Sequence, residues 1–375
     1  MKIIVAGDFY PNGYTGQLIN DQKDYNAVLE EVRPLLKQAD YSMVNLECPV
    51  VSGSGFPIEK CGPHLRTTSN GVEAIKWAGF KMANLANNHI LDYGVKGLQD
   101  TEMICRSLGL DIVGTGKNEE EASKVFYKEI KNKVLAVINC CEHEFSVATR
   151  KKAGANPLNP IRQYQRIQEA KQKADFVLVI THGGHECFQL PSLRMIETYR
   201  FFIDVGADCV INHHQHCFSG YEIYNSKPVF YGIGNFCFEK LGTTNSTWNE
   251  GYLVELDIEE KISFSLHPYL QCNGNGKVEF LKDITQFEKR LEELNTILRD
   301  LDKLEYVCAK FYDGFEKHTL GMFEPYSGKY FQAAFYRGLL PSFFKREKRN
   351  FALNQIMCES HKDKIEYLLK KTIKN

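Results

Sequence analysis

The segment Ala86-Asn87-Asn88-His89-Ile90-Leu91-Asp92-Tyr93-Gly94 is the part of this 375-residue chain that decides its fold. It begins where a short apolar run at 81–86 ends, and a helical pattern at 95–108 follows it. An extended run, a polar turn and a helix in this order are typical of a βα unit. The polar residues of such a turn lie at the carboxyl end of the strand, where ligands bind in α/β sheets.

The same alternation extends over residues 1 to about 275. It predicts strands at 2–7, 41–46, 81–86, 111–114, 133–140, 176–181 and 208–212, and helices at 24–39, 70–78, 95–108, 160–174 and 192–205. Strands that alternate with helices indicate a largely parallel sheet. We expect Asn70 to cap the helix at 70–78, with Glu73 three residues further on completing a capping box.

The pattern changes after residue 215. Segments 219–224, 228–233, 252–258 and 262–270 follow one another without helices and predict antiparallel strands, so the domain is mixed and contains two sheets. From about 283 the pattern is helical, with Phe287, Leu291, Leu294 and Leu298 on one face. We therefore predict a domain at 1–282 and a helical C-terminal extension at 283–375. The aromatic and basic run at 343–349 is interpreted either as a solvated face or as a docking surface.

Bulk composition excludes several classes of protein. The formal net charge of -1 gives no reason to expect nucleic-acid binding. No apolar run reaches the roughly 20 residues of a membrane-spanning helix, and Asp8 interrupts the first apolar run too early for a signal peptide. The twelve cysteines are scattered and most are expected to be structural. These features predict a cytoplasmic protein, and no cysteine has the ordered base that a cysteine hydrolase requires.

Side chains that bind metals follow five of the predicted strands. They are Asp8, Glu47, Asn88 with His89, His182, and His213 with His214. Because the carboxyl ends of parallel strands converge on one edge of a sheet, we expect these side chains to lie together. Carboxylate, amide and imidazole ligands in one site favour Mn²⁺, Zn²⁺ or iron. A shared carboxylate would allow two ions to be held close together.

Two spacings add detail to this site. His214 and His216 are two residues apart, so a loop can direct both rings towards a common centre. Asp92 follows His89 by three residues and is placed to orient its imidazole and stabilise the protonated form. The alternatives are structural: Asp8 simply ends a strand, and His89 with Asp92 forms a hydrogen-bonded pair without catalytic function.

The segment 86–94 resembles the A-N-N-H-x-x-D-x-G signature of the bacterial CapA family of capsule and poly-γ-glutamate synthesis proteins. That family is similar to the calcineurin-like metallophosphoesterases. The resemblance covers roughly residues 1–240, and its elements occur in the expected order. They are Gly7-Asp8, Asn45-Leu46-Glu47, the Asn-His segment, Thr181-His182-Gly183-Gly184-His185-Glu186, Gly206-Ala207-Asp208 with the cluster at 213–216, and Gly234-Asn235-Phe236.

The resemblance implies a four-layer α/β/β/α sandwich of the metallophosphoesterase type, followed here by the helical extension. It also implies roles for individual residues. Asp8, Glu47 and His216 would hold one ion, whereas Glu47, Asn88, His182 and His214 would hold another. His89 would contact the reacting phosphoryl group, assisted by Asp92. Substrate contacts would come from Lys60, Arg66, Glu186 and Asn235.

Two positions depart from the metallophosphoesterase pattern. That pattern begins with Asp-x-His, but the third position here is Tyr10, so one ligand of the first ion is missing. Its second motif uses Asp where this chain has Glu47. Both departures are shared with CapA-like proteins. They leave open whether the site holds one divalent ion or two.

Three functional hypotheses follow. The first is a metal-dependent phosphoesterase or phosphodiesterase of surface-polymer synthesis, acting on an anionic small molecule or polymer. The second is a non-hydrolytic accessory protein, or an amide-bond enzyme, of poly-γ-glutamate or capsular polymer synthesis and export. It would bind a polymer-synthesis partner through the C-terminal extension. The third is a degenerate fold that binds without catalysis.

Overall fold

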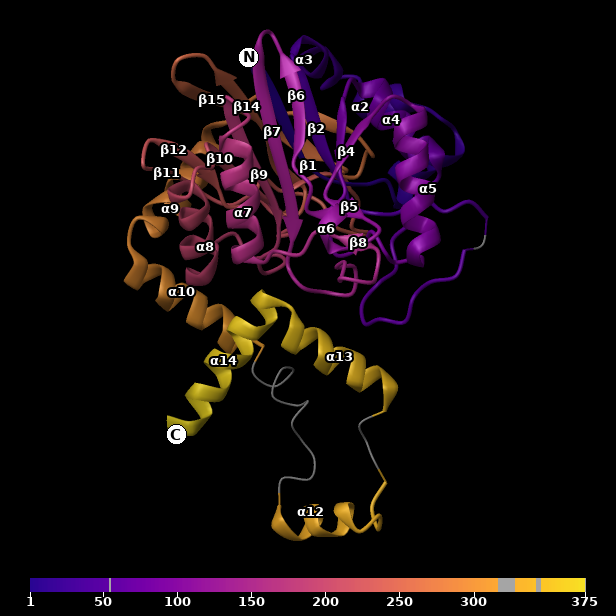
Figure 1. Ribbon diagram of the computed structural model, residues 1–375, viewed down its shortest axis with the longest axis vertical. Helices are drawn as coiled ribbons and strands as arrows, with labels where there is room; N and C mark the ends of the chain where they lie inside the picture. Colours follow the sequence, from indigo (N-terminus) through magenta and orange to yellow (C-terminus); the bar gives the residue numbers. More distant parts are fainter. Residues whose placement is uncertain (54, 316–327, 342–344, 375) are drawn as a thin grey trace.

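The computed structural model describes residues 1–53, 55–315, 328–341 and 345–374, and its strands form two large sheets packed face to face (Figure 1). The predicted aromatic and basic run therefore lies partly outside the described residues, because 342–344 are not among them. Among the described residues, no helix combines the length and hydropathy needed to cross a lipid bilayer. None of the twelve cysteines forms a disulfide, and ten of them are buried.

The first sheet contains the N-terminal parallel strands. Its order is β16 (Val278–Phe280), β15 (Ile262–Gln271), β14 (Glu250–Ile258), β1 (Lys2–Tyr10), β2 (Tyr41–Leu46), β3 (Met82–Asn84) and β4 (Asp111–Val113), and β13 (Asn235–Phe238) also pairs with β1. Strands β1 to β4 are parallel, whereas β14, β15 and β16 pair antiparallel. The predicted mixture of parallel and antiparallel strands is confirmed.

The second sheet comes from the middle of the chain. Its order is β11 (Tyr221–Tyr224), β12 (Lys227–Phe230), β10 (Cys209–His213), β9 (Phe176–His182), β7 (Lys133–Cys141) and β6 (Phe126–Ile130). Strands β7, β9, β10 and β12 are parallel. A small ladder between β5 (Thr115–Gly116) and β8 (Gly154–Ala155) stands apart from both sheets.

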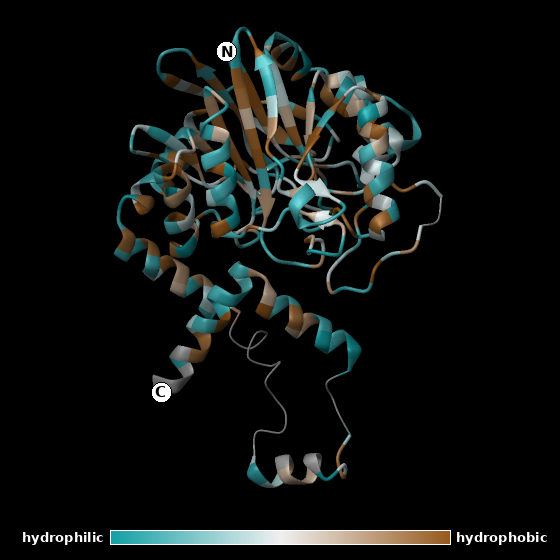
Figure 2. Cartoon of the chain, in the orientation of Figure 1, coloured by the Kyte–Doolittle hydropathy of each residue, from teal (hydrophilic) through white to brown (hydrophobic). Residues whose placement is uncertain are grey.

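Alternation along each strand builds the four layers. In β1, Ile3 and Val5 pack into the core between the sheets, whereas Ile4 and Ala6 face the opposite side. The outer face of the first sheet is covered by helices that include α4 (Ser69–Ala78) and α5 (Gly94–Ser107), and that of the second by α7 (Pro160–Lys171) and α8 (Leu193–Asp204). Figure 2 shows the hydrophobic strands inside this shell. The predicted α/β/β/α sandwich is confirmed.

Several local predictions need correction. The helix expected at 24–39 is divided into α2 (Tyr25–Leu29) and α3 (Arg33–Gln38), because Pro34 has no N–H and fits the first turn of a new helix. Thr68, not Asn70, caps α4, since its hydroxyl accepts a hydrogen bond from the backbone N–H of Asn70. Strands β6, β13 and β16 were not predicted. Short helices α1 (Gly13–Gly16), η1 (Gln17–Asp21) and α6 (Glu119–Ala122) complete the N-terminal half.

The C-terminal part is helical, as predicted. It contains α9 (Thr285–Leu298), α10 (Leu301–Asp313), α12 (Lys329–Tyr336), α13 (Arg346–Met357) and α14 (Glu359–Lys374). Phe287, Leu291, Leu294 and Leu298 are buried on one face of α9 and belong to the same core as the two sheets. The domain boundary at 282 stays a prediction, although α9 packs directly on the sandwich.

Candidate metal centre

Six side chains with metal-binding atoms meet where strands of both sheets end. Asp8 lies near the end of β1, Glu47 directly follows β2, and Asn88 lies in the loop after β3. His182 ends β9, and His214 and His216 follow β10 in the second sheet. All six are buried, with exposed fractions of 8% or less. The structure thus brings together the residues that the sequence predicted as ligands, half of them from each sheet.

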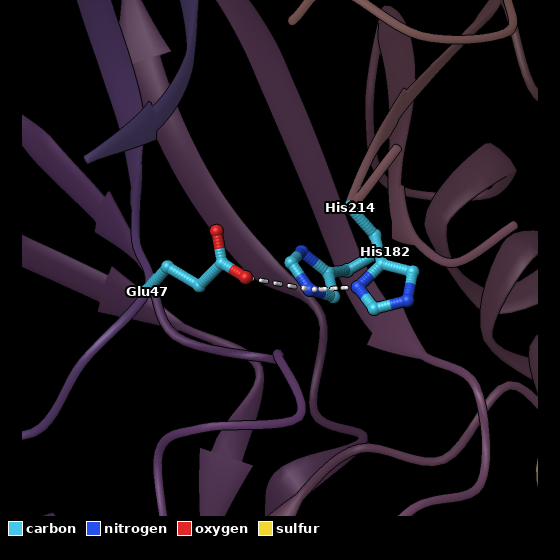
Figure 3. A group of neighbouring side chains, drawn as sticks. All are labelled: Glu47, His182 and His214. Atoms are coloured by element: carbon cyan, nitrogen blue, oxygen red, sulfur yellow. Dashed lines mark hydrogen bonds and ion pairs between the residues drawn. The ribbon is translucent and has the colours of Figure 1, made fainter. Parts of the chain in front are cut away.

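One group consists of Glu47, His182 and His214, which point towards one another in Figure 3. His182 Nε2 lies 3.6 Å from Glu47 Oε1 and 3.1 Å from His214 Nδ1. Asn88 Oδ1 lies 3.0 Å from the same His182 nitrogen. Ligand atoms of one ion with bonds near 2.1 Å are about 3.0–3.4 Å apart, so this spacing is close to that of a coordination sphere.

A second group shares the Glu47 carboxylate. It consists of Asp8, Glu47 and His216, with His216 Nε2 3.7 Å from Glu47 Oε1 and His216 Nδ1 3.6 Å from Asp8 Oδ2. These two groups match the division of ligands that the family resemblance implied. A third group, which joins Glu186 to His214 and His216, was not predicted, because Glu186 was assigned to the substrate side of the site.

Glu47 provides the test of whether a cation fits. Its side chain is fully buried, yet neither carboxylate oxygen has a hydrogen-bond partner among the described residues. Burial, followed by the charge of Asp8, raises the pKa of Glu47 well above its ordinary value. A buried carboxylate without hydrogen bonds is costly unless a cation compensates it. Two buried carboxylates beside three imidazoles therefore fit a divalent metal ion.

Backbone geometry and neighbouring amides orient the histidines. His214 and His216 both have left-handed backbone angles, with φ of 86° and 56°, which residues other than glycine adopt rarely. Asn235 Oδ1 lies 2.9 Å from His216 Nδ1, so Nε2 of that ring is directed towards Glu47. His213 turns away from these ligands, and its Nε2 lies 3.1 Å from the Ala6 carbonyl.

His89 belongs to a separate chain of contacts at the edge of the centre. Its Nδ1–H donates to Asp92 Oδ2 at 2.7 Å, and Asp92 also forms an ion pair with the buried Lys60. Burial lowers the pKa of His89 to about 4, although the hydrogen bond to Asp92 acts in the opposite direction. The structure therefore joins His89 to Asp92, as the spacing predicted. Lys60, expected to contact substrate, is paired with Asp92 instead of being open to solvent.

The remaining predicted residues lie at different depths. Arg66 is exposed, with its guanidinium 5.7 Å from the centre of the Tyr93 ring. Glu186 is also exposed and borders the histidines. Asn235 is fully buried and supports His216. Tyr10 packs edge-on against Phe238, and burial raises its pKa to about 12. A neutral phenol thus occupies the position of the missing histidine.

Two asparagines that connect the ligands, Asn45 and Asn87, lie in the motifs of the sequence, but sequence reasoning assigned them no role. Asn45 Nδ2 donates to Asp8 Oδ1 at 2.7 Å and lies 3.3 Å from His182 Nδ1. Asn87 Nδ2 donates to the Leu46 carbonyl at 2.8 Å and faces Asn45 Oδ1 at 3.3 Å. Each adjoins or nearly adjoins a predicted ligand in sequence. Polar residues at the end of a buried strand were the signal that could have identified them.

Residues 2–240 match the model of a family described as bacterial capsule synthesis protein PGA_cap. The capsule biosynthesis protein CapA of Bacillus anthracis is 32% identical over 64% of this chain and 60% of its own length. The PGA biosynthesis protein CapA of Bacillus subtilis is 30% identical over 82% of this chain and 80% of its own.

Solved structures show similarity of fold alone. A putative 5'-nucleotidase from Staphylococcus aureus has a TM-score of 0.45 and 17% identity, covering 78% of this chain and 58% of its own. A phosphatase from Mycoplasma pneumoniae has a TM-score of 0.43 and 15% identity, covering 77% of this chain and 96% of its own. Similarity at this level does not define a reaction.

Proposed function

The chain belongs to the family of bacterial capsule synthesis proteins, and from that membership we propose that it is a metal-dependent hydrolase of phosphoesters or phosphodiesters. Its biological setting would be the synthesis of a capsule or another anionic surface polymer. The observation that carries the proposal is Glu47, whose two buried oxygens have no hydrogen-bond partner among the described residues although three imidazoles surround it.

The ligands would be Asp8, Glu47, Asn88, His182, His214 and His216. A divalent cation held there supplies Lewis-acid activation of a phosphoryl oxygen and a nucleophilic hydroxide at neutral pH. Manganese, zinc or iron suits this mixture of oxygen and nitrogen ligands better than magnesium. The proposal includes one bound ion or two, because Tyr10 stands where the metallophosphoesterase pattern has an imidazole ligand of the first ion.

His89 would act on the substrate directly. With Nδ1 bonded to Asp92, its Nε2 is left for an oxygen of the substrate. An anionic phosphoryl oxygen at this nitrogen favours the protonated ring, and Asp92 stabilises that form. His89 then transfers its proton to the leaving oxygen, a role that typically contributes about 10²–10⁴-fold in rate. Lys60 compensates the buried charge of Asp92 throughout.

The test is hydrolysis of bis-p-nitrophenyl phosphate and p-nitrophenyl phosphate by the full chain loaded with Mn²⁺ or Zn²⁺. We expect turnover that is lost on chelation, in His214→Ala and in His89→Ala, with bound metal retained only in the last. His267→Ala, on strand β15, is the matched control. Absence of turnover with both metals, or turnover independent of His89 and His214, would reject the hydrolase.

The names of the relatives favour a second candidate. They describe proteins of capsule and PGA biosynthesis, and a Mycobacterium tuberculosis relative is named a probable polyglutamine synthesis accessory protein. In this alternative the chain would be an accessory protein or an amide-bond enzyme that binds a polymer synthetase through residues 283–375. A defined complex with such a synthetase, together with normal polymer production by His89→Ala, would favour it over the hydrolase.

A further inference from the structure

One face of helix α14 is buried. Lys364, Ile365 and Leu368 are buried, with exposed fractions of 9%, 8% and 0%. His361 precedes Lys364 by three residues and Ile365 by four, so all four residues lie on the same face of the helix. Helix α14 contacts α10 and α13, and the N-terminal part of its buried face carries the imidazole and the ammonium group.

A buried polar network fixes this end of α14 beside the metal centre. Glu142, which follows β7, accepts hydrogen bonds from the backbone N–H and hydroxyl of Ser360 at 3.2 and 2.9 Å. Arg194 joins Glu142 to Asp363, with contacts of 2.7 and 2.9 Å. The backbone N–H of Glu142 donates to the carbonyl of His182 at 3.0 Å. One residue therefore contacts both a candidate ligand and the helix.

Helix α13 continues this connection to the loop that contains Lys60. Asn350 Nδ2 donates to Glu59 Oε1 at 3.0 Å, and Arg346 forms an ion pair with the same carboxylate. In Figure 1, α13 and α14 lie below the edge at which β7 and β9 end. Helix α13 and the start of α14 thus lie near the edge that holds the candidate metal ligands, outside the segment matched by the family model.

Lys364 is a buried cation with no hydrogen bond or ion pair among the described residues. Its Nζ lies over the Phe315 ring, 4.6 Å from the centroid, and burial lowers its pKa. Burying an ammonium group without an anion is unfavourable, and a cation–π contact offsets only part of the cost. Such an arrangement is expected where a ligand supplies an anion in direct contact with the ammonium group.

His361 presents a second donor on the same face. Its Nδ1 accepts from the Asn354 amide at 3.3 Å, which makes Nε2 the protonated nitrogen of the neutral ring. Within the described part of the chain Nε2 has no hydrogen-bond partner. His361 interacts electrostatically with Glu144, whose Oε1 lies 3.9 Å from Nε2 of the ligand His214. Lys364 interacts in the same way with Glu186.

We propose that His361 and Lys364 form an anion subsite beside the metal centre, which binds a second carboxylate or phosphate group of the substrate. The inference rests on the proposed function and deepens it, because it restricts the substrates to phosphoesters that carry another anionic group. Glu144 interacts electrostatically with His361, and Glu186 with Lys364. Their charge disfavours anions that lack the hydrogen bonds offered by the imidazole and the ammonium group.

The experiment measures binding of three probes to the Mn²⁺-loaded full chain by titration calorimetry. Propylphosphonate carries no second anion, 3-phosphonopropionate adds a carboxylate, and propane-1,3-diphosphonate adds a phosphonate. We expect the wild type to bind at least one of the last two about tenfold more tightly than the first, as one charge-assisted hydrogen bond allows. The tighter of the two identifies the second group as carboxylate or phosphate.

Lys364→Gln and His361→Gln should each reduce that preference to about twofold or less, while propylphosphonate binding and metal content stay unchanged. Lys362→Gln, exposed on the same helix, is the control and should retain the preference. The subsite is rejected if the wild type shows no preference, or if both variants keep it. Propylphosphonate that fails to bind, even with metal, rejects the proposed hydrolase itself and the subsite with it.

A stability measurement gives an independent result. Lys364→Met keeps the packing of the stem against Phe315 but removes the unpaired charge. If the charge is retained for a ligand, the metal-free and ligand-free variant should melt at a higher temperature than the wild type. A lower melting temperature would show that Lys364 stabilises the fold, which contradicts the subsite.

Discussion

At the scale of single residues, Lys60 and Asp92 form the most deeply buried lysine–carboxylate ion pair among the described residues. Their side chains are 4% and 0% exposed. Removing one partner of such a pair leaves an uncompensated charge, whereas removing both leaves none. The pair therefore positions His89, and we expect the fold to lose stability when only one of its two charges is removed.

Asp92→Asn should consequently destabilise the protein by about 3 kcal/mol, measured by denaturant unfolding. The double variant Lys60→Met/Asp92→Asn should recover part of that loss, because no unpaired ammonium group remains. Asp100→Asn removes the partner of Lys96, whose side chain is 79% exposed, and should cost less than about 1 kcal/mol. Equal effects of the two Asp→Asn changes would contradict the role given to burial.

Glu47→Gln tests the shared ligand with almost no change of shape. Bound Mn²⁺, measured by elemental analysis after desalting, should fall at least about tenfold. The metal-free variant should be more stable than metal-free wild type near neutral pH, because burial disfavours the Glu47 carboxylate and glutamine carries no charge. Glu222→Gln on the edge strand β11 should retain the metal. Full metal content in Glu47→Gln would remove Glu47 from the centre.

At the scale of elements, we expect Glu142 to hold the start of α14 against the sandwich through its hydrogen bonds with Ser360. Burial alone would raise the pKa of Glu142, but Arg194 and Ser360 lower it to about 2, against an ordinary value of 4.5. A carboxyl group whose folded pKa is lowered stabilises the fold above its unfolded pKa. That stabilisation is lost as the pH falls from about 4.5 towards 2.

Glu142→Gln should therefore cost about 3 kcal/mol near neutral pH, and the difference from wild type should shrink as the pH falls through this window. Hydrogen exchange should accelerate over residues 358–369 more than over α5, which lies on the other side of the sandwich. A stability difference that does not change with pH would show that the charge of Glu142 has no part in docking.

The elements that the sequence predicted well are those with strong local signals. Parallel strands such as β2 and β9 are buried on both faces and read as continuous apolar runs. Strand β6 has a half-exposed pattern, and β13 has only four residues and pairs with β1 across more than 200 positions, so neither has a clear local signature. The division of the helix at 24–39 could have been predicted from Pro34.

The same distinction applies to the site. The rule that ligands lie at carboxyl ends of strands led to Asp8, Glu47 and His182 as candidate ligands, because it needs only local patterns. The contacts of Glu142 with Ser360 and of Lys60 with Asp92 join residues that are far apart in the sequence or separated by an irregular loop. Such contacts depend on how loops and helices pack, which periodicity does not encode.

At the scale of the whole molecule, metal binding should stabilise the fold globally. At a Mn²⁺ concentration about 100 times the dissociation constant, the free energy of unfolding should rise by about 2.7 kcal/mol. His89→Ala should show the same rise, because His89 is not among the ligands, whereas His214→Ala should not. Thermal unfolding with Mn²⁺ or with EDTA measures both. Equal shifts in the two variants would contradict the assignment of His214.

The division of the ligands between two sheets has a mechanical meaning. Each sheet is tied internally by its own ladder of backbone hydrogen bonds, but side-chain packing is what mainly joins one sheet to the other. An ion bound by Asp8 and Glu47 on one side and by His182 and His214 on the other would cross-link the two sheets. Force applied to slide the sheets past each other would load the metal–ligand bonds directly, so the candidate metal centre would also be the point where the sandwich resists shear.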